Sequence, residues 1–345
     1  MRRFVHIDGH NLFHRQVNMT PSNQGVESMV GMAFHLIFNS MKKEFTTWNA
    51  SHAMFYLEGK SWRKRIYPEY KANRALAFSM KTEKEQEDFK FILDAYNDLT
   101  TYLNDKTNIS VIRNPAAEAD DMIHICVEAH PDDDHLLVST DSDFYQLLRM
   151  PNVRIYDPIK DVLITRDGVF NDAGKRMEFT LTSTAKIKVG EPNPNFQAPE
   201  AWYDYALFLK LIRGDKGDNI FSSYPGVREK GTTKKVGIKE AFEDRHTRGY
   251  SWNNFMNQRY MHHDGNERTV KEAYELNRLL IDLMEIPPDI KLQSLEIISQ
   301  SLGKVIPSVD IGTGFLKFCG KWELNKISEH AADFMPMLKS KYDHG

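Results

Sequence analysis

Short apolar runs alternate along the first half of the chain with longer stretches in which apolar residues recur every three or four positions. The short runs predict buried strands over residues 4–7, 53–57, 109–112, 136–139 and 153–156. Helical spacing covers residues 26–45, 84–103, 117–129 and 144–148. Strands that alternate with helices predict a parallel sheet with helices on both faces. The expected fold class is therefore α/β, with a mostly parallel central sheet flanked by helices.

The pattern changes after the fifth strand. Gly, Asn, Pro and Thr dominate residues 168–199, with short β-like pieces such as 179–182, which indicates a peripheral insertion or a connector. From residue 200 the spacing is mostly helical, interrupted by a turn-rich stretch over 214–237. We expect two parts: an α/β core over residues 1–199 and a helical region over residues 200–345.

Composition places the chain among ordinary globular proteins. Its 345 residues are 41% hydrophobic and 27% charged, and 45 basic residues against 48 acidic ones give a net charge of −3. Two cysteines, Cys126 and Cys319, cannot build a disulfide framework. No apolar run approaches the roughly 18 residues of a membrane span, and a charge interrupts the apolar stretch of the basic N-terminus. The expectation is a soluble, cytoplasmic protein.

Local charge changes this neutral picture. Residues 118–143 contain nine acids and no Lys or Arg, whereas residues 58–74 hold six bases against two acids, and residues 210–239 hold eight bases against three acids. Such blocks are either solvated surfaces or a metal-binding centre flanked by surfaces for a polyanion. Charge patterning alone leaves both interpretations open.

Carboxylates gather where the predicted strands end. Six of them follow strands or open the next helix: Asp8, Glu58, Glu118, Asp120, Asp141 and Asp143. A single acid at such a place is usually a helix N-cap, but six at one edge of a parallel sheet would repel one another unless cations neutralise them. Oxygen ligands favour Mg²⁺ or Mn²⁺ over zinc. A further pair, Asp215 and Asp218, is either a polar turn or a second group of ligands.

Taken together, these segments resemble the flap endonuclease/5′-nuclease family, and most closely its bacteriophage ribonuclease H branch, the 5′→3′ exonucleases of T-even phages. The matching segments occur in the order of that family over roughly residues 4 to 290: His6-Ile7-Asp8-Gly9-His10-Asn11, Glu58-Gly59-Lys60-Ser61-Trp62-Arg63, Tyr67-Pro68-Glu69-Tyr70-Lys71-Ala72-Asn73-Arg74, Glu118-Ala119-Asp120-Asp121, Ser139-Thr140-Asp141-Ser142-Asp143-Phe144 and Gly214-Asp215-Lys216-Gly217-Asp218-Asn219.

The resemblance implies a PIN-like nuclease core with a helical arch around residues 60–104, and a DNA-binding helix–three-turn–helix around residues 214–242. It implies a structure-specific 5′-nuclease, a 5′→3′ exonuclease and flap endonuclease with ribonuclease H activity. Such an enzyme hydrolyses phosphodiesters with two metal ions, leaves 5′-phosphates, and removes RNA primers and 5′ flaps in DNA replication and repair. Alternatives are a non-catalytic branched-DNA-binding protein on the same fold and a PIN-type ribonuclease.

The resemblance also assigns roles to residues. One ion would be held by Glu58, Glu118, Asp120 and Asp141, and the second by Asp143, Asp215 and Asp218, with Asp8 reaching both directly or through water. Lys71 and Arg74 would be catalytic, steadying the phosphate. Tyr70 would either stack on a base or pack in the core. The remaining predicted nucleic-acid-binding residues are Lys60, Arg63, Lys64, Lys230, Lys234 and Lys235.

The implied cofactors are two Mg²⁺ ions, which Mn²⁺ can replace, and K⁺ at the helix–three-turn–helix. The implied partners are DNA and RNA–DNA duplexes with 5′ ends or flaps, and a single-stranded-DNA-binding protein or clamp, with the nuclease itself monomeric in the cytoplasm of a phage host. Two features depart from the family. Glu58 stands where Asp is usual, and nine residues separate Val227 from the Gly237 turn, which stretches the DNA-binding element.

Overall fold

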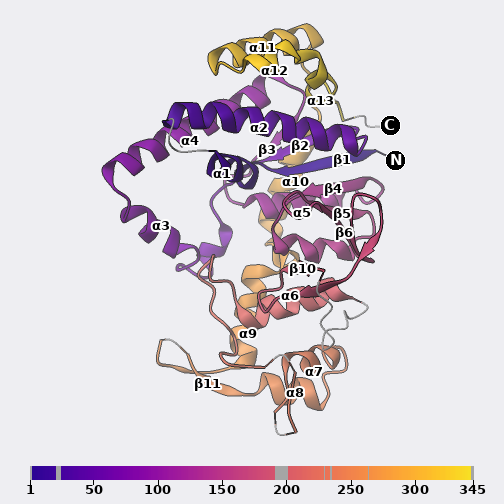
Figure 1. The fold of residues 1–345 in the computed structure, drawn as a ribbon. Helices are drawn as coiled ribbons and strands as arrows, with labels where there is room; N and C mark the ends of the chain where they lie inside the picture. The colour runs from indigo at the N-terminus through magenta and orange to yellow at the C-terminus, as the bar shows by residue number, and fades with distance from the viewer. Residues whose placement is uncertain are drawn as a thin grey trace.

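An eight-stranded sheet forms the centre of the computed structural model, which describes residues 2–20, 25–190, 201–228, 230–233, 235–262 and 264–342 (Figure 1). Its strand order is β3-β2-β1-β4-β5-β6-β7-β8. The strands are β1 (Arg3–Asp8), β2 (His52–Tyr56), β3 (Ser110–Ile112), β4 (Asp134–Val138), β5 (Val153–Asp157), β6 (Val162–Thr165), β7 (Gly168–Phe170) and β8 (Arg176–Met177). The first five in this order are parallel, and the last three are added antiparallel. The predicted mostly parallel sheet is thus confirmed.

Helices cover both faces of the sheet, as the alternating pattern predicts. On one face lie α1 (Gly9–Met19), α2 (Val26–Thr47), α4 (Glu83–Lys106), α11 (Ser308–Lys321), α12 (Asn325–Glu329), η5 (Ala331–Phe334) and α13 (Met335–Leu338). On the other lie α5 (Ala119–Ala129), η3 (Ser142–Arg149), α6 (Trp202–Arg213) and α10 (Pro288–Leu302). Phe38 of α2 illustrates the packing, because its ring centroid lies 5.4 Å from that of Phe315 in α11. In the part of the chain that the structure describes, no helix is long and apolar enough to cross a membrane.

The C-terminal helices differ from the predicted division into two parts. The boundary predicted at residues 199 and 200 lies outside the described residues. Helices α10 and α11 pack against α5, β3 and α4, so residues 288–338 complete the layers around the sheet. The other end of the molecule holds α7 (Ile238–Glu243), α8 (Tyr250–Met256), the hairpin of β11 (Arg259–Met261) and β12 (Glu267–Thr269), and α9 (Val270–Ile281) (Figure 1). Residues 288–338 thus lie around the sheet, whereas residues 238–269 lie at the other end of the molecule.

An arch projects from the sheet edge at which the parallel strands end. Its base is the 3₁₀ helix η2 (Trp62–Arg65), and its limbs are α3 (Ala72–Ser79) and the N-terminal half of α4 (Figure 1). No residue of α3 is buried. Helix α4 begins with a capping box, in which Thr82 and Glu85 bond each other's backbone N–H groups. The Phe78 ring of α3 also lies 5.1 Å from the Phe89 ring of α4, so an aromatic contact joins the two limbs.

The turn-rich stretch predicted to carry the helix–three-turn–helix connects α6 to α7. An isolated bridge joins Asp215 to Ile220, and the two residues exchange backbone hydrogen bonds. Further along, the Glu240 carboxylate of α7 accepts the backbone N–H groups of Gly231 and Gly237, both at 2.9 Å. These bonds fold the described part of residues 214–237 back onto the start of α7.

The structure also adds the short pair β9 (Phe179–Leu181) and β10 (Ile187–Val189) where β-like pieces are expected.

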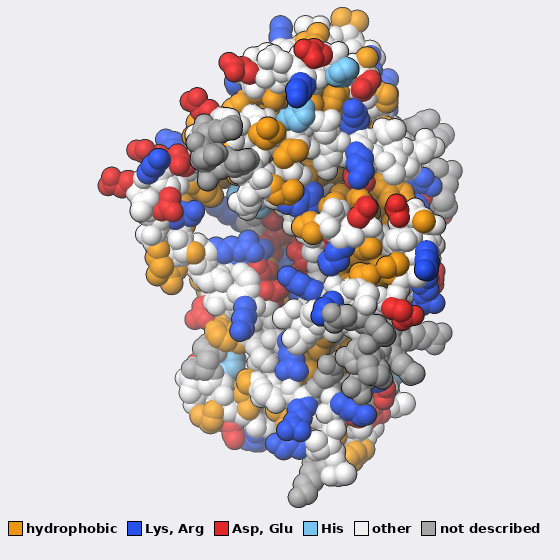
Figure 2. Space-filling model, viewed as in Figure 1, with side chains coloured by type: hydrophobic (Ala, Val, Ile, Leu, Met, Phe, Trp, Pro, Cys, Tyr) orange, Lys and Arg blue, Asp and Glu red, His pale blue; other side chains and the backbone are white. Residues whose placement is uncertain are grey.

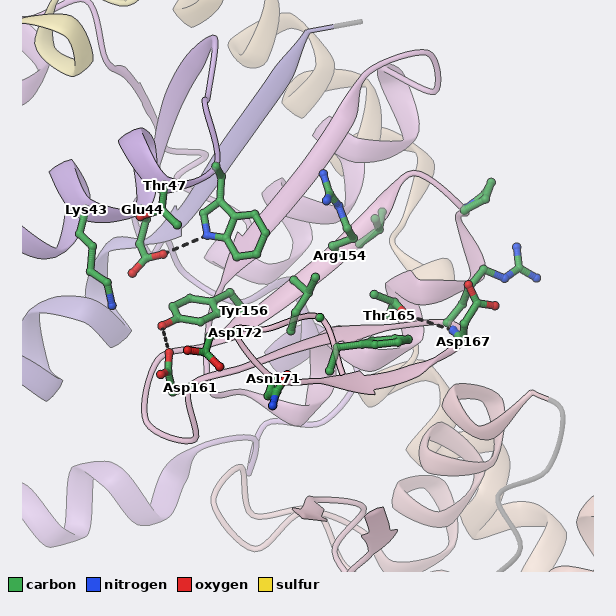
Figure 3. A pocket seen from close by; sticks show the side chains of 17 residues that line it. Lys43, Glu44, Thr47, Arg154, Tyr156, Asp161, Thr165, Asp167, Asn171 and Asp172 are labelled. Atoms are coloured by element: carbon green, nitrogen blue, oxygen red, sulfur yellow. Dashed lines mark hydrogen bonds between the residues drawn. The ribbon is translucent and has the colours of Figure 1, made fainter. Parts of the chain in front are cut away.

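A cavity of about 730 Å³ lies where the C-terminal end of α2 meets β5, β6 and β7 (Figure 3). The Tyr156 hydroxyl there donates to Asp161 at 2.5 Å, and Glu44 accepts the indole N–H of Trp48 at 3.1 Å. Among the described residues that line it, there is none of the carboxylates predicted to bind metal. The candidate chemistry lies elsewhere.

A chain of buried hydrogen bonds crosses the middle of the sheet. It joins the Tyr56 hydroxyl to His6 Nδ1, and His6 Nε2 to His135 Nδ1, both at 2.8 Å, and ends at the backbone carbonyl of His130. A carbonyl only accepts, so His135 carries its proton on Nε2, His6 donates to it, and Tyr56 donates to His6. Burial lowers the pKa of His135 to about 4 and that of His6 well below its usual value, so both rings are neutral at pH 7.

Replacing Tyr56 by Phe tests this chain. Tyr56→Phe should lower the free energy of unfolding by about 1–3 kcal/mol, because it leaves the buried acceptor His6 Nδ1 without a donor. Urea unfolding of both proteins at pH 7 measures the difference. Tyr250→Phe is the matched control, since Tyr250 is exposed and should give no change. Equal stability of Tyr56→Phe and wild type would contradict the assigned direction of the hydrogen bonds.

Candidate metal centre and nucleic-acid interface

Acidic side chains converge at the edge where the parallel strands end. Asp8 is the last residue of β1 and caps α1 by accepting the backbone N–H of Asn11 at 3.0 Å. Glu58 follows β2 and accepts the N–H of Ala119 at 3.3 Å. Asp141 follows β4 and caps η3. The strand-end acids therefore have the capping roles that the simplest interpretation gives them, and they nevertheless point at a common place.

Three of the acids form the tightest group. Ligand oxygens of Asp120, Asp141 and Asp143 all lie within 4.8 Å of one another, and each residue is partly buried. Burial raises the pKa of Asp120 well above its usual value, and the charges of Asp141 and Asp8 raise it further. Burial likewise raises the pKa of Asp8 to about 6 and that of Glu58 to about 7. These groups cannot all ionise together without a cation.

Lys210 links a further acid, Asp215, to the group of Asp120, Asp141 and Asp143. Lys210 of α6 is 6% exposed, and its ammonium donates to Asp143 and lies 3.2 Å from Asp215. Burial disfavours ionisation of Asp215, but Lys210 outweighs burial and holds the pKa of that carboxyl below its usual range. Lys210 is not among the site residues that the sequence predicts. A lysine in the last turn of an apolar helix is usually a solvent-exposed partner of the helix dipole, and only the tertiary structure shows it turned inward.

Cations from the base of the arch pair with two further acids, Glu118 and Asp218. The Lys71 ammonium donates to Glu118 and lies 3.7 Å from Asp218, and Arg74 contacts Asp218 at 2.7 Å. Lys71 adopts φ = 57°, a left-handed conformation that is uncommon for a residue with a side chain. The two predicted catalytic cations therefore lie at the acidic cluster, as neighbours of Glu118 and Asp218.

Two predicted nucleic-acid contacts are wrong in this structure. Arg63 and Tyr70 are each only 3% exposed. Arg63 is paired with Glu118 and Asp121, and the Tyr70 hydroxyl donates to Glu118 and to Asp218, both at 2.9 Å. Core packing, the alternative for Tyr70, is what the structure shows. Neither side chain has a face on which a nucleotide can lie.

The other predicted contacts lie on the surface where they are described. Lys60 and Lys64 are exposed at the base of the arch, and Lys230 and Lys235 are exposed on the turns before α7. Lys234 lies outside the described residues. Figure 2 shows acidic side chains deep in the hollow between the arch and the body of the molecule, with Lys and Arg side chains around the opening and below it. An anion that approaches the acids on this face passes these cations.

The donor set fits divalent metal ions of the magnesium type. All eight predicted ligands are carboxylates: Asp8, Glu58, Glu118, Asp120, Asp141, Asp143, Asp215 and Asp218. Hard cations such as Mg²⁺ and Mn²⁺ prefer such oxygen ligands. Burial, with neighbouring acids adding to it, raises the pKa values of Asp8, Glu58 and Asp120, and a bound cation would favour their ionised forms.

Comparisons with known proteins agree with this geometry. Residues 3–174, about half of the chain, match the family model of the 5′-3′ exonuclease N-terminal resolvase-like domain. The flap endonuclease Xni of Psychromonas ingrahamii is 29% identical over 140 residues, which are 39% of this chain and 48% of the relative. The chain thus matches about half the length of that curated relative.

Solved structures from bacteriophage T5 share the fold. The T5 5′-exonuclease with bound zinc is 19% identical, with a TM-score of 0.58. The T5 flap endonuclease in a pseudo-enzyme-product complex with DNA and metal ions is 21% identical, with a TM-score of 0.54. Both comparisons cover 87% of this chain, and 99% and 100% of the respective T5 chains. These two structures show the shared fold. The match to the family model shows that the chain belongs to the flap endonuclease/5′-nuclease family.

Proposed function

We propose that this protein is a structure-specific 5′-nuclease that uses two Mg²⁺ ions to hydrolyse phosphodiesters at 5′ ends and 5′ flaps of DNA and RNA–DNA duplexes. The observation that carries the proposal is the buried acidic cluster beneath the arch, with Asp120, Asp141 and Asp143 within 4.8 Å of one another. Removal of RNA primers during replication, as in the phage ribonuclease H branch, is the proposed role.

The proposed ligand sets are those that the family resemblance implies. Asp120, Asp141 and Glu118 would hold one ion with Glu58, and Asp143, Asp215 and Asp218 would hold the other, with Asp8 beside both. The ions would supply an activated water and stabilise the leaving oxygen of an in-line displacement. Because Asp120, Asp141 and Asp143 are so close, we propose that they hold the two positions together.

Once metal ions neutralise the carboxylates, the cations at the site can also bind substrate phosphates. Lys71 and Arg74 come from the base of the arch and Lys210 from α6, so they approach the acids from two sides. We propose that Lys71 and Arg74 bind the phosphate on which negative charge develops. Lys60, Lys64, Lys230 and Lys235 would bind phosphates away from the reacting bond, which makes binding tolerant of sequence and sensitive to salt.

Replacing the central acids tests the metal assignment. Asp141→Asn and Asp143→Asn should each lower the cleavage rate of a 5′-flap substrate by at least about a hundredfold, because a neutral amide is a poor ligand for a hard cation. DNA binding in EDTA should stay near wild type or become tighter, since a negative charge is lost. Asp310→Asn, at an exposed position of α11, is the control. Rates within tenfold of wild type in both variants would refute the assignment.

The two described lysines of the turn-rich stretch test the duplex contact. Lys230→Ala combined with Lys235→Ala should weaken duplex binding to a similar extent for different sequences, and reduce the slope of log affinity against log salt concentration by roughly two units. Fluorescence anisotropy at several salt concentrations measures the slope. Lys317→Ala with Lys326→Ala, exposed at the opposite end of the molecule, should leave it unchanged. An unchanged slope in the first pair would mean that these turns are only solvated.

Glu58 offers the test of a single ligand. Glu58→Asp should keep the cleavage rate within about tenfold, a barrier change near 1.4 kcal/mol, whereas Glu58→Gln should lose much more and need more Mg²⁺ for half-maximal rate. Since the pKa of Glu58 is raised to about 7, protons compete with metal near neutrality, and wild type should need more Mg²⁺ at pH 6 than at pH 8. Mg²⁺ titrations of the initial rate decide this. A Glu58→Gln enzyme with wild-type Mg²⁺ dependence would remove Glu58 from the site.

A further inference from the structure

Arg63 is a cation buried at the base of the arch, with 3% of its surface exposed. Its guanidinium makes four hydrogen bonds to fixed partners. Nη1 donates to Glu118 at 2.9 Å and to Asp121 at 3.0 Å, Nη2 donates to the other oxygen of Asp121 at 2.8 Å, and Nε donates to the backbone carbonyl of Leu280 at 2.7 Å. Asp121 raises the pKa of Arg63, against the effect of burial. All four of these Arg63 hydrogen bonds are therefore made to groups inside the protein.

Asp121 completes this arrangement from the first turn of α5. It is 0% exposed, and besides Arg63 it accepts the indole N–H of Trp62 at 3.1 Å and the backbone N–H of Glu118 at 3.0 Å. The bidentate pair of Arg63 and Asp121 therefore fixes η2 to the start of α5. Because Asp121 bonds the backbone of Glu118, the same pair also sets where the main chain of that proposed metal ligand lies.

The two oxygens of Glu118 have different surroundings. Oε2 accepts hydrogen bonds from Arg63, from the Ser61 hydroxyl at 3.0 Å and from the Tyr70 hydroxyl at 2.9 Å. Oε1 has Lys71 as its partner and is the oxygen left for the acidic cluster. Burial acts to raise the pKa of Glu118, yet Lys71 and Arg63 together hold it below its usual range. Glu118 is thus kept ionised. Its Oε2 is held by hydrogen bonds, and its Oε1 is the oxygen directed to the acidic cluster.

The fourth bond of Arg63 reaches a distant part of the chain. Leu280 lies in the last turn of α9, where backbone carbonyls have no partner within the helix. Arg63 satisfies one of them, and so joins the arch base and α5 to the helix that follows the β11–β12 hairpin. Lysine cannot replace these contacts, because its single ammonium lacks the planar fork that bonds Asp121 twice and Leu280 from a third nitrogen.

We propose that Arg63 is a positioning residue of the metal centre, which acts through Asp121 and Glu118 and makes no contact with nucleic acid. This inference rests on the proposed function, since it assumes that Glu118 is a metal ligand. It assigns different roles to two neighbouring cations of η2: Arg63 orients a ligand, whereas Lys64, which is exposed, is proposed to bind phosphate.

Two measurements on Arg63→Lys separate these roles. The first is the Mg²⁺ concentration that gives half of the Mg²⁺-induced rise in thermal unfolding midpoint, a readout that needs no catalysis. It should increase by about tenfold or more, the usual effect of removing a group that orients a metal ligand. The second is duplex binding in EDTA at several salt concentrations, where affinity and salt slope should match wild type. Lys64→Ala should give the converse result: unchanged Mg²⁺ dependence and a smaller salt slope.

Further variants cover the case in which Arg63→Lys does not fold. Arg63→Met with Asp121→Asn removes both buried charges, and should fold while still requiring more Mg²⁺, because Glu118 has lost its hydrogen bond. In a Glu118→Gln background, Arg63→Lys should shift the Mg²⁺ dependence no further, since both act through one carboxylate.

The outcomes that overturn the inference differ from those that overturn the proposed function. Wild-type Mg²⁺ dependence of the double variant, or a reduced salt slope in Arg63→Lys with unchanged Mg²⁺ dependence, overturns the positioning role alone. A wild-type protein that gains no stability from Mg²⁺ and cleaves no flap substrate overturns the proposed function, and the inference with it.

Discussion

Repulsion between buried carboxylates is the constraint on which the rest of this structure depends. Parallel strands deliver their carboxyl ends to one edge, and there Asp8, Glu58 and Asp120 have raised pKa values because burial and neighbouring acids both oppose ionisation. Such a cluster costs stability on its own. It persists because cations from several elements pair with the acids around it. The same ion pairs hold those elements in place.

The cations around the acidic cluster come from the base of the arch and from α6, which couples distant parts of the chain. Lys71 comes from the base of the arch, Lys210 from α6, and Arg63 from η2 with a further bond to α9. The arch and the helices around the turn-rich stretch are therefore attached to the sheet through the acidic cluster itself. A metal ion bound at the cluster would therefore change the electrostatic surroundings of Lys71 at the arch base and of Lys210 in α6 together.

The sequence predicts the sheet and the acids well because both depend on short-range patterns. A buried parallel strand is a continuous apolar run, and an acid directly after it is placed by the end of the strand, as Asp8 and Asp141 show. What the sequence cannot give is the direction of a long cationic side chain. Arg63 and Lys64 are adjacent in one basic block, yet the first is buried and the second exposed. Lys210 differs from a solvent-exposed helix-end lysine only through its tertiary contacts.

Basic blocks near an acidic cluster therefore have two physically distinct uses that sequence alone cannot separate. Counted as charges, residues 58–74 form one cationic surface for a polyanion. In the structure, Arg63, Lys71 and Arg74 pair with Glu118, Asp121 and Asp218, and Lys60 and Lys64 remain exposed. Inward cations orient the carboxylates, and Lys71 and Arg63 hold the pKa of Glu118 below its usual range against the effect of burial. Outward cations attract the phosphate backbone over longer range. The net charge of −3 follows only from 45 basic and 48 acidic residues, and does not distinguish these two uses.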